Sequence, residues 1–215
     1  MRDAADGATG ASLDWAVAVR AVPGESVCGD VAVGVERAGR HVLAVVDGLG
    51  HGPEAAHAAR LAVGVVEDHP EGTPAVLLAQ MHRRLADSRG AAATVLVVDV
   101  GTGLLDWLGV GNVDAVVVRA DGAARPPVHG VFMAGGVLGA QMPVLPETRP
   151  VRLAHGDSIV VATDGVRADL AEAARSPLRP DVLARRLLDE HALPRDDALV
   201  LAARYLAARP ARVAW

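Results

Sequence analysis

A buried strand that ends in an acid and turns at once into a helix is the strongest constraint in this sequence. Residues 41–46 (HVLAVV) are apolar and rich in valine, which is typical of a strand inside a sheet. Asp47 follows directly, and residues 48–53 (GLGHGP) combine glycines, which allow tight turns, with a proline suited to the first turn of a helix. The pattern predicts a helix over 53–66 and places the Asp47 carboxylate at the edge of a sheet.

The glycines of this segment do not form a common phosphate-binding loop. The sequence lacks GxxxxGK[ST], and the glycine spacing after Asp47 is not GxGxxG. An Asp-Gly pair also occurs in ordinary turns, so Asp47 alone does not identify a site. The interpretation depends on whether other acids occupy similar positions.

Three more acidic positions stand at the ends of strand-like segments. Residues 157–163 (DSIVVAT) lead into Asp164, and Asp30 opens the apolar segment 31–35. The pair Asp196–Asp197 precedes a further strand-like run. Four strand ends therefore carry carboxylates.

Carboxylates gathered at strand ends predict a site for hard divalent cations. Mg²⁺ and Mn²⁺ prefer carboxylate and water oxygens, and they need only a few protein ligands. Two such ions about 3.5 to 4 Å apart can share a carboxylate and activate water for in-line attack on phosphorus. A zinc site is disfavoured, because Cys28 is the only cysteine and no histidine pair has the HExxH spacing.

Taken in order along the chain, the acidic motifs resemble those of the PPM (type 2C) metal-dependent protein phosphatases, specifically the SpoIIE-type branch. The matching motifs are Gly29-Asp30, residues 47–52 (DGLGHG), residues 163–165 (TDG) and residues 196–198 (DDA). Residues 108–112, 135–139 and 151–157 also follow that branch. The resemblance covers about residues 12–206, and the short stand-alone form is similar to the RsbX-like phosphatases of bacterial stress-signalling modules.

This resemblance implies roles for individual residues. Asp47 would be shared by two metal ions, and the Gly48 carbonyl would bind one of them. Asp164 and Asp196 would complete the other metal site. Asp30 would occupy a peripheral acidic position near the second metal, where coordination can run through water.

Two neighbouring candidates require a choice. Side chains alternate along a strand, so Asp196 and Asp197 are expected to point in opposite directions. The family motif favours Asp196 as the metal ligand.

His51 has two interpretations that remain open. In one, it lies close enough to the metal site to act catalytically, by donating a proton or orienting the phosphate, together with Asp47 and Asp164. In the other, it only packs against the turn that surrounds it.

The resemblance also implies the reaction and its substrate. Two Mn²⁺ or Mg²⁺ ions would activate water to attack a phosphoserine or phosphothreonine monoester, without a covalent enzyme intermediate. The substrate would be a phosphorylated STAS-domain protein in bacterial stress or sigma-factor partner-switching signalling. Two alternatives remain open: a signalling module that binds partners without turnover, and a phosphatase of small phosphoesters.

One expected residue is missing. Many members of the superfamily hold the substrate phosphate with an arginine shortly before the first acidic motif, but residues 25–30 (ESVCGD) contain none. Arg20 and Arg167 are the nearest candidates, and both are interpreted as solvated surface charges. The sequence therefore does not identify the residue that contacts phosphate.

Other polar residues are assigned to the scaffold. They are His57 inside the predicted helix, His155 and Asp157 in a surface hairpin turn, Asp169 at the start of a short helix, and Cys28 as an inert packed residue.

Composition restricts the compartment and the partners. The chain has 215 residues, of which 51% are hydrophobic and 2% aromatic, and a formal net charge of −5. Few aromatic rings and a negative charge argue against nucleic acid as a partner. Without an apolar run of roughly 20 residues or a signal peptide, the sequence predicts a cytoplasmic protein that does not bind membranes. The oligomeric state is not predicted.

The remaining pattern predicts an α+β fold. Strands are expected near 14–20, 31–36, 41–46, 94–100, 104–108, 115–119, 157–163 and 198–203, with helices over 53–66, 74–88 and 181–190. Together with the resemblance, this order implies an αββα sandwich of two antiparallel sheets flanked by helices, with metals at one end of the sheets. One phosphatase domain is expected over 12–206, with flexible tails at 1–11 and 207–215.

Overall fold

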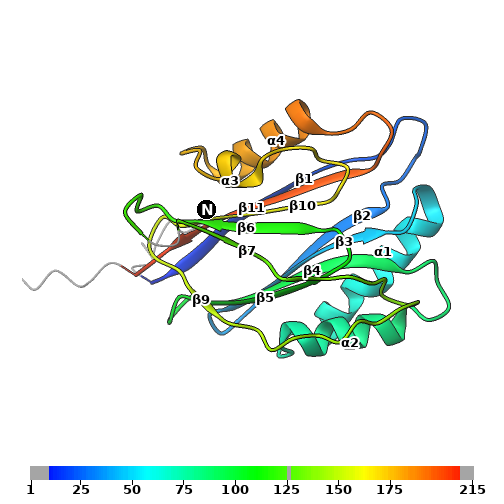
Figure 1. The fold of residues 1–215 in the computed structure, drawn as a ribbon, viewed down its shortest axis with the longest axis horizontal. Coiled ribbons are helices and arrows are strands. Elements are labelled where there is room, and N and C mark those ends of the chain that lie inside the picture. The colour runs from blue at the N-terminus through cyan, green and yellow to red at the C-terminus, as the bar shows by residue number, and fades with distance from the viewer. Residues whose placement is uncertain (1–9, 125–126, 209–215) are drawn as a thin grey trace, which may run out of the picture.

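Two β-sheets stack face to face, and each carries helices on its outer face (Figure 1). This computed structural model describes residues 10–124 and 127–208. The five-stranded sheet has the order β1-β11-β10-β6-β7; the six-stranded sheet has the order β2-β3-β4-β5-β8, with β9 paired to β5. The predicted αββα sandwich is confirmed.

The elements have the following bounds. The strands are β1 (Ser12–Arg20), β2 (Asp30–Arg37), β3 (Arg40–Gly48), β4 (Ala91–Asp99), β5 (Leu104–Val110), β6 (Asp114–Val118), β7 (Val128–Gly130), β8 (Met133–Ala134), β9 (Val151–Arg152), β10 (Ser158–Ala162) and β11 (Ala198–Leu206). The helices are α1 (Gly52–Asp68), α2 (Pro74–Arg84), α3 (Leu170–Ala173) and α4 (Pro180–His191).

Three apolar layers hold the sandwich together. One lies between α1, α2 and the six-stranded sheet, one between the two sheets, and one between the five-stranded sheet and α3 and α4. Strand β3 serves two of these layers, because Val42, Ala44 and Val46 face the helices while Leu43 and Val45 face the other sheet. This double burial explains why the strand is apolar at nearly every position.

The structure differs from the expected elements in short segments. Strands β7, β8 and β9 have only two or three residues, too few to show a periodic pattern in the sequence. The pairing of β8 with β5 is parallel, whereas the other strand pairs of the two sheets are antiparallel in the described residues. Helix α2 ends at Arg84 rather than near Ser88, and the Ser88 hydroxyl donates to the Leu85 carbonyl in the turn that follows.

The predicted tails lie largely outside the described residues, which exclude 1–9 and 209–215. None of the helices in the described part of the chain combines the length and hydrophobicity needed to cross a bilayer.

Candidate metal centre

Antiparallel pairing brings the first two acids together. Asp30, at the start of β2, lies directly opposite Asp47, near the end of β3. The hydroxyl of Thr163, which follows β10 in the other sheet, donates to Asp30 Oδ2 at 2.7 Å. The two sheets therefore meet at this acidic end of the sandwich.

Burial and mutual repulsion disfavour the charged forms of these acids. Burial raises the pKa of Asp30 to about 7, with repulsion from Asp197, Asp196 and Asp164 adding to it and the Thr163 hydrogen bond opposing it. Burial, followed by repulsion from Asp30, raises the pKa of Asp47 to about 8. A cation at this end would relieve both effects.

Asp164 and Asp196 contribute from the five-stranded sheet. Asp164 lies beyond the end of β10 and Asp196 just before β11, and these strands are adjacent and antiparallel. The side-chain amide of Asn112 donates to Asp164 Oδ2 at 2.6 Å. Burial and repulsion from Asp164 raise the pKa of Asp196. Each of the four acids therefore interacts electrostatically with another member of the group.

Asp197 has different interaction partners from the neighbouring Asp196. It is buried, and its carboxylate accepts hydrogen bonds from the backbone N–H groups of Val22 and Gly29, both at 2.7 Å. These bonds fix the segment that leads into Asp30. The structure thus gives Asp197 backbone partners, while Asp196 is half-buried and interacts electrostatically with Asp164.

Glycines at two of the turns permit close backbone packing. A Cβ on Gly48 would lie 2.1 Å from the carbonyl oxygen of Ala55 in α1. A Cβ on Gly165 would lie 1.8 Å from the carbonyl oxygen of Asp197. Neither position can accept a side chain without moving backbone, so packing requires the glycine of each Asp-Gly pair.

His51 is held at the rim by a second acid. Its Nδ1 atom lies 2.7 Å from Glu25 Oε1, and 60% of its side chain is exposed. Its charge lowers the pKa of Asp196, which places the imidazole within electrostatic range of the acids. The histidine is therefore accessible and oriented, and its catalytic role stays a prediction.

Two sequence-based assignments are corrected. Arg20 is not a solvated surface charge, because its guanidinium is partly buried and donates to the Leu193 carbonyl at 2.6 Å. Asp157 is not at the surface, because its side chain is buried and paired with Arg119 at 2.6 Å. Each departs from expectation for the same reason: a partner distant in the sequence satisfies the polar group.

The other assignments agree with the structure. Arg167 and His155 are exposed, and the Asp169 side chain caps α3 by accepting from the backbone N–H of Glu172 at 3.0 Å. Burial raises the pKa of the Cys28 thiol to about 12, which makes it a poor nucleophile. His57 lies within α1, as expected.

The donor set fits a hard cation, although it does not form a closed coordination shell. In the described part of the chain, no three His, Cys, Asp or Glu side chains are grouped so that they could hold a metal ion. Asp30 and Asp164 are instead hydrogen-bonded to Thr163 and Asn112. Oxygen donors suit Mg²⁺ or Mn²⁺, and a carboxylate can accept a hydrogen bond through one oxygen while it binds an ion through the other.

Sequence reasoning missed the neutral partners of the acids. Thr163 and Asn112 were visible only as members of motifs, with no role assigned. Their location in the sequence could have marked them as site residues, because each follows the end of a strand, as Asp164 does.

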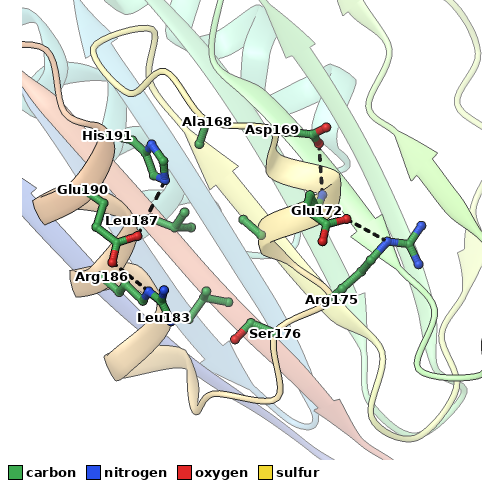
Figure 2. Close-up of a pocket in the computed structure, with 11 residues that line it drawn as sticks. Ala168, Asp169, Glu172, Arg175, Ser176, Leu183, Arg186, Leu187, Glu190 and His191 are labelled. Carbon is green, nitrogen blue, oxygen red and sulfur yellow. Dashed lines mark hydrogen bonds and ion pairs between the residues drawn. The ribbon is translucent and has the colours of Figure 1, made fainter.

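A groove between α3 and α4 is separate from this centre (Figure 2). It has a volume of about 440 Å³, and none of the predicted site residues lines it. Its charged side chains pair with one another, Arg175 with Glu172 at 3.6 Å and Arg186 with Glu190 at 2.9 Å. The acids at the strand ends therefore remain the candidate site.

Comparisons with known proteins agree with this architecture. A family model described as Stage II sporulation protein E (SpoIIE) matches residues 37–206. A chain from a structural study of the bacterial stressosome, described as a modular system adapted to control secondary messenger signalling, is 31% identical and has a TM-score of 0.81. That match covers 90% of this chain and 100% of the other.

Two further structures share the fold at lower identity. RsbX in complex with magnesium is 20% identical with a TM-score of 0.79, and the match covers 90% of this chain and 95% of RsbX. The structure of the PP2C phosphatase domain with a fragment of the regulatory domain of SpoIIE from Bacillus subtilis is 18% identical with a TM-score of 0.77, covering 93% of this chain and 65% of that one. No curated protein is significantly similar to the chain in sequence.

Proposed function

Because the chain belongs to the SpoIIE family, we propose that it is a Mg²⁺- or Mn²⁺-dependent phosphatase of phosphoserine and phosphothreonine proteins. The observation that carries the proposal is the convergence of four acids, from four strand ends of two sheets, on one end of the sandwich. The raised pKa values of Asp30 and Asp47 mark this end as short of positive charge.

Five residues would hold two ions in this proposal. Asp47 would be the shared ligand, with the Gly48 carbonyl beside it and Asp30, Asp164 and Asp196 completing the set. When bound, the ions would activate a water molecule and neutralise charge on the phosphoryl oxygens.

The protein's own groups would prepare this chemistry. Thr163 and Asn112 orient Asp30 and Asp164 through the hydrogen bonds described above. His51, oriented by Glu25, would donate a proton to the leaving serine or threonine oxygen. Cys28 takes no part, because its raised pKa keeps the thiol protonated.

The proposed substrate is a phosphorylated STAS-domain protein in the cytoplasm. Support comes from the 31% identity to a chain from a bacterial stressosome structure and from the shared fold with RsbX. A protein substrate would also gain binding energy from contacts away from the phosphate.

The test measures phosphate release from a phosphoserine-bearing STAS protein across a Mn²⁺ titration, with an EDTA control. Wild-type protein should turn over only with metal. Asp47→Asn should lower turnover by about a thousandfold, because losing the bridging charge removes several kcal/mol of electrostatic stabilisation. Release by the folded Asp47→Asn protein at the wild-type rate would refute the site. Metal binding without any release would instead favour a binding module.

A further inference from the structure

Arg89 lies beside the turn that follows Asp47, and its side chain has no structural task in the core. Its Nη1 atom is 2.9 Å from the position that a Cβ on Gly50 would occupy. Its Nη2 atom is paired with Glu54 Oε2, in the first turn of α1. The guanidinium therefore rests against the backbone of the turn that carries the proposed metal ligands Asp47 and Gly48.

The loop that carries Arg89 is anchored to this turn. The backbone N–H of Leu49 donates to the Gly90 carbonyl at 3.0 Å. The Ser88 hydroxyl donates to the Leu85 carbonyl at 2.8 Å and accepts from the Gly90 N–H at 3.1 Å. Arg89 thus extends from a fixed backbone position.

A side-chain cation would help to bind the phosphate dianion in the proposed reaction. The segment just before Asp30, where many members of the superfamily have an arginine, does not supply one here. Glu25 stands in the segment that precedes Asp30, and Arg20 is committed to the Leu193 carbonyl. The chain contains no lysine, so its permanent side-chain cations are all arginines. We propose that Arg89 binds the phosphate group of the substrate; this inference rests on the phosphatase function proposed above.

The Arg89–Glu54 pair is suited to exchange. Half of the Arg89 side chain and 69% of the Glu54 side chain are exposed, so water screens the pair and its net stabilisation is small. A phosphate dianion offers the guanidinium two oxygens in a matching fork and carries more charge than a carboxylate. Substrate phosphate can therefore replace Glu54.

The space beside Arg89 allows a ligand to approach. A hollow of about 440 Å³ is lined by Pro53, Glu54, His57, Asp87, Ser88 and Arg89. It adjoins the first turn of α1, which directly follows the Asp47 turn. The hollow leaves room for residues that flank a phosphorylated side chain next to Arg89.

The test uses p-nitrophenyl phosphate as substrate and inorganic phosphate as competitive inhibitor, at saturating Mn²⁺. Arg89→Ala should raise both KM and the phosphate Ki by about tenfold or more, with a smaller fall in kcat. Arg89→Lys should fall between wild type and Arg89→Ala, because it keeps the charge but loses the fork. Glu54→Gln should lower the phosphate Ki several-fold, since it removes the competing carboxylate.

Two arginine variants serve as matched controls. Arg167 is exposed three residues after Asp164, and Arg84 is paired with Asp68 at 3.6 Å on the surface of the α1–α2 layer. Neither Arg167→Ala nor Arg84→Ala should change KM or Ki. If Arg167→Ala raises KM and Arg89→Ala leaves it unchanged, the phosphate binds Arg167 rather than Arg89, and the proposal is overturned.

Calorimetry separates this inference from the proposed function. If wild-type protein does not hydrolyse p-nitrophenyl phosphate or the phosphoprotein, the phosphatase proposal fails. Titration of inorganic phosphate into the Mn²⁺-saturated protein still tests Arg89. Weaker binding by Arg89→Ala at unchanged Mn²⁺ affinity supports the inference, and equal binding by both proteins refutes it.

Discussion

Strand β10 has an acidic site at each end, and the carboxylates of the two sites have opposite kinds of partner. Asp157 precedes the strand and is paired with Arg119, and it also accepts from the backbone N–H groups of Ala120 and Ala154 at 2.9 and 2.8 Å. At the other end, Thr163 and Asp164 meet a group of carboxylates that repel one another.

The difference shows how one residue type serves structure or chemistry. Asp157 is paired with Arg119 and hydrogen-bonded to backbone N–H groups, so the protein itself supplies the partners that the buried carboxylate needs. Asp30 and Asp47 lack such a partner, and burial therefore favours their neutral forms. Cations are therefore expected to bind at the end of the sandwich that contains Asp30 and Asp47.

The largest expected effect on stability comes from the satisfied end. Asp157→Asn should lower the free energy of unfolding by about 3 kcal/mol, because it leaves the largely buried Arg119 without its counter-charge. Urea denaturation followed by circular dichroism measures this loss.

Asp47→Asn is the matched control for that measurement. In metal-free protein it should not destabilise the fold, because burial already favours the neutral form of Asp47, which asparagine resembles. If Asp157→Asn and Asp47→Asn destabilise the protein equally, the carboxylates at the two ends of β10 do not differ in their contribution to stability.

The pH dependence of metal-free stability should reveal the acidic end. Asp30 and Asp47 have folded-state pKa values of about 7 and about 8, above the ordinary value of 3.8 expected in the unfolded chain. The folded state therefore holds more protons, and stability is full below the unfolded pKa and is lost as pH rises through 7 to 8.

We expect the metal-free protein to lose stability between pH 5 and pH 8 in EDTA. Mn²⁺ should reduce this loss, since bound metal replaces the protons. Thermal unfolding at both pH values, with and without Mn²⁺, checks the prediction. A metal-free stability that rises over this range, in both wild type and Asp47→Asn, would contradict it.

The smallest expected effect concerns the neutral partner of Asp164. Asn112→Ala removes the hydrogen bond to Asp164 Oδ2 and should weaken Mn²⁺ binding by about tenfold, as loss of a group that orients a metal ligand does. Calorimetric titration of Mn²⁺ gives the affinity, and Asn112→Asp tests whether an added carboxylate compensates. Unchanged affinity in Asn112→Ala would show that Asp164 needs no orienting partner.

Much of the architecture was predictable because its causes are local. The apolar run 41–46 has buried side chains on both faces, so the strand is visible without knowing which layers cover it. The Asp47 turn and the helix after it follow from glycine and proline chemistry. The short strands β7–β9 were not predictable, because their pairing depends on neighbouring strands rather than on their own two or three residues.

By itself, the sequence determined the long elements, their order and the presence of an acid at each of four strand ends. Only the tertiary structure decided what each acid meets: Arg119 for Asp157, backbone amides for Asp197, and other carboxylates for Asp30 and Asp47. The physical reason is the distance along the sequence between the residues that determine each property. Secondary structure follows from the polarity of nearby residues, whereas the charge state of a buried group depends on partners that sheet packing brings from distant parts of the chain.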